Sequence, residues 1–250
     1  MEKNFSIGGR ISQLYKHFPT LCRPTCGQEI NLRRLKANKR IRLLTMAEVT
    51  AISGTPGDYT VSVTVRPRYV NENCTACYRR LLAPRQRVMD LMAGWHTHLP
   101  ASCGPVLGVD MNAEEMADNP QLDDYLVHDL SRGSGLPIAD ESFDAVVNSV
   151  SIEYLVQPVA MLRDVCRKLK RGGQMIITFS DRYFPPKAIR LWQRLHPVER
   201  VVWVAGLMQQ AGFQNIHTLV EQGVGRPPDD RYAAQRQEMD PLLAVWGLRT

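Results

Sequence analysis

The sequence lacks any apolar run of about eighteen residues, the length that a helix needs to cross a bilayer. Residues 1–10 also lack the apolar centre of a secretory signal peptide. Repeats and low-complexity tracts are missing too, whereas 44% of the 250 residues are apolar, which is ample for a buried core. We therefore expect a globular, cytoplasmic protein without a membrane partner.

Cysteine is scarce, with six residues at positions 22, 26, 74, 77, 103 and 166. Without an export signal we expect a reducing compartment, in which structural disulfides are rare. Metal binding and plain burial are the two interpretations that stay open for these thiols.

Positive charge is concentrated near the amino terminus. Residues 1–85 hold 15 Lys and Arg against 5 Asp and Glu, whereas residues 86–250 hold 16 against 20. The basic side chains of residues 33–42 fall in a predicted solvated helix and turn, so we do not expect nucleic-acid binding.

From residue 86 onward, apolar runs of strand length alternate with segments of helical period. Strands are predicted at 88–92, 106–109, 126–130, 143–150 and 174–179, and helices at 112–117 and 159–169. Pro158 suits the start of the second helix, and Gly172 suits its end. A helix at 197–212 and strands at 215–220 and 242–248 complete an α/β fold: a Rossmann-like three-layer sandwich around a mainly parallel sheet.

Residues 41–70 have a different pattern. Strands at 41–44 and 59–65 surround a turn at 54–57, which predicts a small, separate α+β unit. Its boundary with the larger unit should fall between Asn71 and Gln86.

Three of the apolar runs end near an acidic residue: Asp90, Asp110 and Asp129. Because the carboxyl ends of parallel strands line one crevice, these carboxylates should converge where a nucleotide-like ligand binds. Asp110 follows Asp90 by twenty residues, a spacing that suits hydrogen bonds from a ribose diol to Asp110. Capping of a helix or turn is the alternative role for each carboxylate.

The glycine-rich loop of dinucleotide-binding proteins is reduced here to Gly94, with Trp95 directly behind it. NAD needs the full loop at a helix N-terminus for its pyrophosphate, so this loop disfavours NAD.

Residues 78 to about 213 resemble class I methyltransferases that use S-adenosylmethionine, especially a group with a "DLM…W…HLP" loop after the first strand. The matching blocks, in the family's order, are residues 90–100, 108–115, 119–123, 128–130, 136–146, 169–173 and 179–188. The resemblance implies methyl transfer from S-adenosylmethionine to a small-molecule acceptor that the sequence does not identify.

The same resemblance implies a cofactor site. The methionine part would face Asp90 and the loop residues Met92, Gly94 and Trp95; the ribose would face Asp110, with Met111 beside it; the adenine would face Asp129 and Leu130; and the sulfonium and acceptor would border Asn148 and Ser149.

The catalytic residue stays unknown from the sequence. Methyl transfer from a sulfonium does not require a strong base, but Glu153, Tyr154 and His96 are the nearest candidates if the acceptor must lose a proton. Arg182 and Lys187 could bind an anionic acceptor, and a solvent-facing role is the alternative for both.

Residues 2–77 resemble the flavin and iron–sulfur subunit of heterodisulfide reductase, through residues 7–14, 17–22, 68–71 and 74–77. In that family this stretch follows a glycine loop that this chain lacks, so we do not expect FAD. We therefore divide the chain into a heterodisulfide-reductase-like fragment at 1–77 and a methyltransferase domain at 78–250.

The amino-terminal cysteines supply the alternative function, a redox or metal-binding protein. The pair at 74 and 77 begins like a ferredoxin motif, but the third cysteine is missing. Cys22, Cys26, Cys74 and Cys77 could instead form a four-thiolate zinc or iron–sulfur site if the fold brings them together. Free thiols in a remnant are the interpretation that we favour.

Overall fold

The computed structural model describes residues 38, 47–55, 57–65, 72–131, 135–223, 225 and 238–250. The chain forms two compact units, residues 1–69 and 70–250. Helix α2 (Glu72–Leu81) opens the second unit, so the division that we placed after residue 77 lies inside this helix.

The described part of the first unit contains an antiparallel hairpin of β1 (Ala47–Thr55) and β2 (Asp58–Val65). Gly54 and Gly57 flank its tip with φ angles of 111° and 97°, and a Cβ on Gly54 would lie 2.1 Å from the Asp58 carbonyl oxygen. Glycine is therefore required at position 54. The predicted strand at 59–65 matches β2, whereas the one at 41–44 lies outside the described residues.

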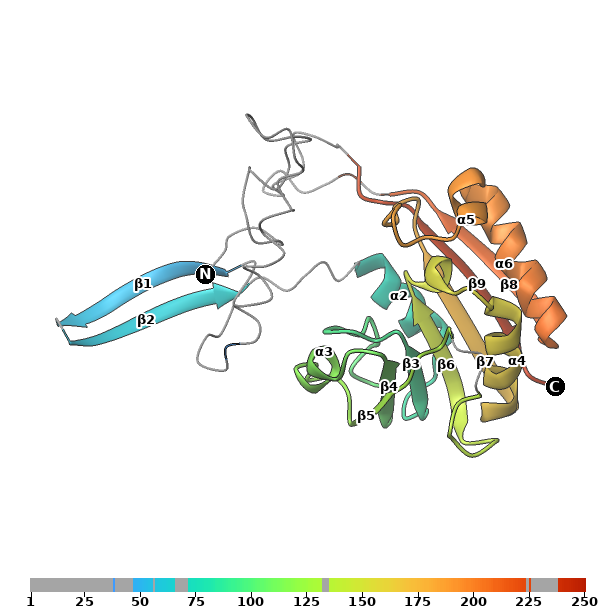
Figure 1. Ribbon diagram of the computed structural model, residues 1–250, viewed down its shortest axis with the longest axis horizontal. Helices are drawn as coiled ribbons and strands as arrows, with labels where there is room; N and C mark the ends of the chain where they lie inside the picture. Colours follow the sequence, from blue (N-terminus) through green and yellow to red (C-terminus); the bar gives the residue numbers. More distant parts are fainter. Residues whose placement is uncertain are drawn as a thin grey trace. The chain divides into compact units, whose positions relative to one another are not determined.

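The second unit is built on a seven-stranded sheet with the order β5-β4-β3-β6-β7-β9-β8 (Figure 1). The strands are β3 (Val88–Leu91), β4 (Val106–Asp110), β5 (Asp124–Val127), β6 (Phe143–Ser149), β7 (Leu169–Phe179), β8 (Gln214–Glu221) and β9 (Leu242–Leu248). Neighbouring strands from β5 to β7 pair in parallel, and β9 runs antiparallel to both β7 and β8. This mainly parallel sheet confirms the predicted Rossmann-like class.

Successive residues of the central strands point to opposite faces of the sheet, and both faces are buried. Met89, Val146 and Ile177 face α4 (Pro158–Lys168) and α6 (Pro197–Ala211). Their neighbours Val88, Val147 and Ile176 share a second apolar cluster with α2 on the opposite face (Figure 1). Two short helices, α3 (Ala113–Ala117) and α5 (Arg190–Arg194), complete the helices of this unit in the described residues.

Three elements differ from their prediction. Strand β7 starts at Leu169, directly after α4, so Gly172 (φ 75°) lies in the strand rather than at a helix end. Strand β5 begins two residues earlier than predicted, and α2 was not predicted as a helix. No helix among the described residues is long and apolar enough to span a membrane.

Candidate functional site

The topology places a crevice at the carboxyl ends of β3 and β6. From β3 the chain continues to β4 and β5 on one side, then crosses to β6 and β7 on the other. Ligands of open α/β sheets bind where the strand order reverses in this way. Leu91 of β3 pairs with Asn148 of β6 at this point.

The turns after these two strands have strained backbones. Met92 follows β3 with a φ of 61°, and Val150 follows β6 with a φ of 49°. A positive φ is a clear outlier for a β-branched residue, and such strain persists where the surrounding structure enforces it. The Met92 amide donates to the Val109 carbonyl at 2.7 Å, and the Val150 amide donates to the Thr178 carbonyl at 2.8 Å. Each turn is thus held by the neighbouring strand.

Asp90 is buried in β3, one residue before the strand ends. Its side chain is 1% exposed, and Oδ1 has no hydrogen-bond partner among the described residues. Burial raises the pKa of this carboxyl to about 7; the Thr97 hydroxyl opposes this shift, and the negative charge of Asp110 adds to it. A buried acceptor oxygen without a partner is costly unless a ligand donor satisfies it.

Asn148 contributes a second such oxygen. Its Nδ2 donates to the Leu91 carbonyl at 3.2 Å and to Ser151 Oγ at 2.9 Å, which fixes the orientation of the amide. Its Oδ1 is buried and has no partner in the described part of the chain. Two adjacent strands therefore each present an unsatisfied acceptor near the crevice.

The other predicted cofactor residues lie along the same edge of the sheet. Asp110 is half-buried, and its Oδ1 accepts from the Asn112 amide at 3.1 Å, while Met111 is 65% exposed. Asp129 caps a turn through the Ser131 amide at 3.0 Å, beside half-buried Leu130.

The loop after β3 also reaches this edge. Gly94 has a φ of 56°, and its carbonyl accepts from Asn119 Nδ2 at 3.1 Å. The neighbouring Trp95 is half-buried.

Ser149, the last residue of β6, belongs to a network that sequence reasoning missed. Its Oγ lies 2.7 Å from the Tyr78 hydroxyl, which lies 3.0 Å from Thr178 Oγ1. Cys74 Sγ lies 3.1 Å from the same threonine oxygen. Helix α2 is thereby joined to the carboxyl ends of β6 and β7.

The candidate bases occupy different environments. Glu153 and Tyr154 lie in a short 3-10 helix, η2 (Ile152–Tyr154), directly after the β6 turn, and the Glu153 side chain is fully buried. His96 is half-buried in the loop after β3. Of the two candidate anion ligands, Arg182 pairs with Asp240 at 3.2 Å, and Lys187 Nζ lies 5.7 Å from the Phe184 ring centroid.

Residues 93–177 match the profile of a protein family described as "Methyltransferase domain". These residues form a methyltransferase domain. The fold of the second unit is also similar to two solved structures. A SAM-dependent methyltransferase from Thermotoga maritima is 18% identical with a TM-score of 0.50, and the match covers 72% of this chain and 89% of that one. A chain from the Haloferax volcanii complex of the Trm112 methyltransferase activator is 20% identical, also with a TM-score of 0.50, over 72% and 88% of the two chains. At these identities the likeness shows the fold alone.

The amino-terminal region is similar to heterodisulfide reductases, in the iron–sulfur component that the sequence predicted. The CoB–CoM heterodisulfide reductase iron–sulfur protein of Methanopyrus kandleri is 40% identical over 78 residues, which are 31% of this chain and 12% of that protein. The corresponding component of the Methanosarcina acetivorans ferredoxin:CoB–CoM heterodisulfide reductase is 36% identical over 83 residues, which are 10% of its length. The chain therefore spans about an eighth or less of these relatives.

The cysteine pair of this region is built into the core of the methyltransferase unit. Cys74 and Cys77 are 0% and 2% exposed in the cluster between α2 and the sheet. Burial raises the pKa of Cys74 to about 12 and also raises that of Cys77, which disfavours the thiolate form that binds metals. Cys22 and Cys26 lie outside the described residues. Among the described residues, no three His, Cys, Asp or Glu side chains are grouped to hold a metal ion.

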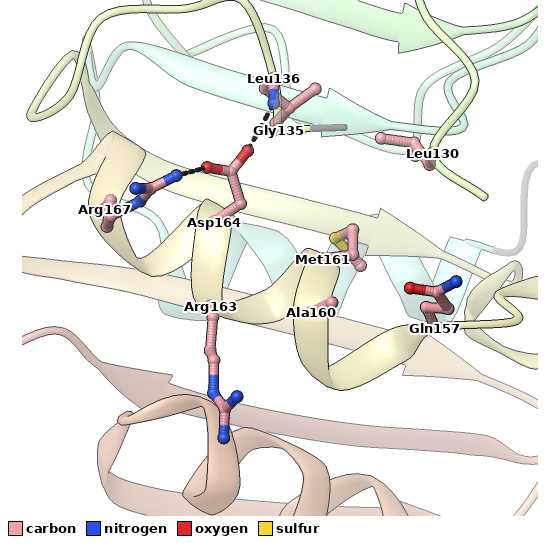
Figure 2. Close-up of a pocket in the computed structure, with 9 residues that line it drawn as sticks. All are labelled: Leu130, Gly135, Leu136, Gln157, Ala160, Met161, Arg163, Asp164 and Arg167. Atoms are coloured by element: carbon pink, nitrogen blue, oxygen red, sulfur yellow. Dashed lines mark hydrogen bonds and ion pairs between the residues drawn. The ribbon is translucent and has the colours of Figure 1, made fainter. Parts of the chain in front are cut away.

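A cavity of about 370 Å³ lies against α4, away from the β3–β6 crevice (Figure 2). Asp164 supports its wall: Oδ2 accepts from the Leu136 amide at 2.5 Å, and Oδ1 pairs with Arg167. Leu130 is the only predicted cofactor residue among the described residues that line this cavity.

Proposed function

We propose that this chain binds S-adenosylmethionine at the carboxyl ends of β3 to β6 and transfers its methyl group to a small-molecule acceptor. One observation carries the proposal. The buried oxygens Asp90 Oδ1 and Asn148 Oδ1 have no partners among the described residues, and they lie beside the strained turns of Met92 and Val150, where the strand order reverses. Buried unpaired acceptors and enforced strain are both typical of ligand sites.

The residues present fit this cofactor chemically. Its methionine ammonium is a hydrogen-bond donor, which suits the two unpaired oxygens of Asp90 and Asn148. The ribose hydroxyls suit Asp110, which ends the neighbouring strand, and the adenine would lie near Asp129 and Leu130.

When bound, the cofactor supplies a methyl group that its positively charged sulfur already activates. The acceptor's lone pair forms the new bond to the methyl carbon, while the electron pair of the broken carbon–sulfur bond remains on sulfur. The protein must therefore align the acceptor and exclude water. The strained, strand-anchored turns would provide the required rigidity.

Calorimetric titration with S-adenosylhomocysteine tests the cofactor site. We expect roughly micromolar binding, which Asp110→Ala should weaken about ten- to hundred-fold because ribose hydroxyls lose their acceptor. Asp118→Ala is the matched control, since Asp118 carries the same charge but caps the far end of α3. If the folded protein binds no S-adenosylhomocysteine at millimolar concentration, the proposed function is wrong.

A further inference from the structure

Glu153 is a buried carboxyl group that the cofactor site does not use. It lies four residues after Ser149, and its side chain is 0% exposed. Neither oxygen has a hydrogen-bond partner among the described residues. A fold gains nothing from a carboxyl group buried in this way, so the group calls for a ligand or a catalytic role.

The nearest cationic side chain does not satisfy Glu153. Arg200 is 5% exposed and influences the charge of this carboxyl, but its Nε donates to the Trp192 carbonyl at 3.2 Å and its Nη1 to the Asp181 carbonyl at 3.2 Å. Its guanidinium also lies 4.8 Å from the centroid of the Tyr183 ring. The arginine is thus committed to main-chain oxygens and aromatic rings, and the carboxyl keeps capacity for another cation.

The segment 180–189, which follows β7, covers η2 with aromatic side chains. The Phe184 amide donates to the Tyr154 hydroxyl at 3.1 Å, and the Ile189 amide donates to the Glu153 carbonyl at 3.0 Å. The Tyr154 and Phe184 ring centroids lie 6.5 Å apart. An acceptor can reach the carboxyl only if this segment moves aside.

Aromatic faces in this segment already contact cations of the chain itself. The Lys187 ammonium lies 5.7 Å from the Phe184 ring centroid. A carboxyl group together with aromatic faces is the combination that binds organic ammonium groups. These surroundings therefore favour a cationic acceptor over the anionic one that Arg182 and Lys187 suggested from sequence.

We infer that Glu153 is a catalytic residue that binds the nitrogen of a primary or secondary amine acceptor and takes up its proton. This inference rests on the proposed function. The proton passes from the ammonium to the carboxylate, and the freed lone pair forms the N–CH₃ bond. The S–CH₃ bond breaks with its electron pair staying on sulfur, so S-adenosylhomocysteine and the methylated amine are the products.

The electrostatic surroundings suit this role. Burial raises the pKa of Glu153 to about 7, whereas the nearby Tyr154 hydroxyl and the positive charge of Arg200 act in the opposite direction. A carboxyl group that titrates near neutrality can both accept and release a proton at physiological pH.

The test uses the full chain saturated with S-adenosylhomocysteine. Calorimetry measures the affinity for methylamine, butylamine, benzylamine and tryptamine, each against the corresponding alcohol, and for butyrate and benzoate. The variant is Glu153→Gln. Glu141→Gln is the matched control, because Glu141 precedes β6 at the opposite end of the strand, where it pairs with Arg249 at 2.8 Å.

We expect at least one amine to bind at least about ten-fold more tightly than its alcohol. Glu153→Gln should abolish this preference, while Glu141→Gln should keep it. The inference is overturned if no amine is preferred, if an anion binds instead, or if the preference survives in Glu153→Gln. Because every protein is first shown to bind S-adenosylhomocysteine, loss of cofactor binding would identify a failure of the proposed function instead.

Discussion

Glu153→Gln should change how the stability of the second unit depends on pH. The pKa of Glu153 is about 7 in the folded protein and 4.5 ordinarily, so the folded state favours the protonated form. Below pH 4.5 both states are protonated and the carboxyl carries no ionisation penalty. As the pH rises towards 7, the unfolded state releases its proton first and stability falls. Glutamine cannot ionise, so its side chain is free of this loss.

The size of the effect follows from the same values. A shift of about 2.5 pKa units corresponds to about 3 kcal/mol, at 1.36 kcal/mol per unit. Full burial of the side chain means that solvent screening does not reduce this figure appreciably. Between pH 4.5 and pH 8, the variant should therefore gain about 3 kcal/mol in free energy of unfolding relative to the wild type.

Urea denaturation at several pH values, followed by tryptophan fluorescence, measures this difference. All four tryptophans lie in the second unit, so the signal reports on that unit alone. Asp90 also has a raised pKa, but it is present in both proteins and its contribution cancels. A difference between wild type and variant that stays constant from pH 4.5 to pH 8 would refute the reasoning.

Three further predictions concern the other buried groups. Asn148→Ala should weaken S-adenosylhomocysteine binding about ten-fold in calorimetry, because the bound ammonium loses a buried acceptor; unchanged affinity would remove Asn148 from the site. Tyr78→Phe should lower the free energy of unfolding in urea by about 1–3 kcal/mol, since Ser149 and Thr178 lose a shared partner; an unchanged midpoint would contradict the network. A fragment of residues 70–250 should give a cooperative thermal transition by circular dichroism, whereas residues 82–250 should not, because the latter lacks α2 and exposes the cluster that this helix covers; equal transitions would show that α2 is dispensable.

The helix that we failed to predict did leave a signal in the sequence. Cys74, Cys77, Tyr78, Leu81 and Leu82 recur at helical spacing and form the apolar side of α2. We interpreted the same cysteines as the start of a cluster motif, and this concealed the helical period. The spacing of two cysteines does not distinguish a metal ligand pair from one face of a helix.

Local pattern alone determined most elements of the larger unit. Runs of buried β-branched and aliphatic residues predicted β3, β4 and β6, and Pro158 marked the start of α4. The end of that helix was wrong because Gly172 usually terminates helices, whereas here pairing of β7 with its neighbours absorbs the glycine into a strand. Propensity is a weak preference that sheet pairing overrides.

The sequence by itself determined the fold class, the two family resemblances and the acidic residues at the strand ends, because these depend on short-range patterns. Tertiary structure alone decided that Cys74 contacts Thr178, that Tyr78 contacts Ser149, and that Glu153 is buried beneath the segment after β7. The first two contacts join residues 104 and 71 positions apart in the chain. Burial and charge environment arise from packing between such distant segments, so they follow from the assembled sheet and helices and not from any local run of residues.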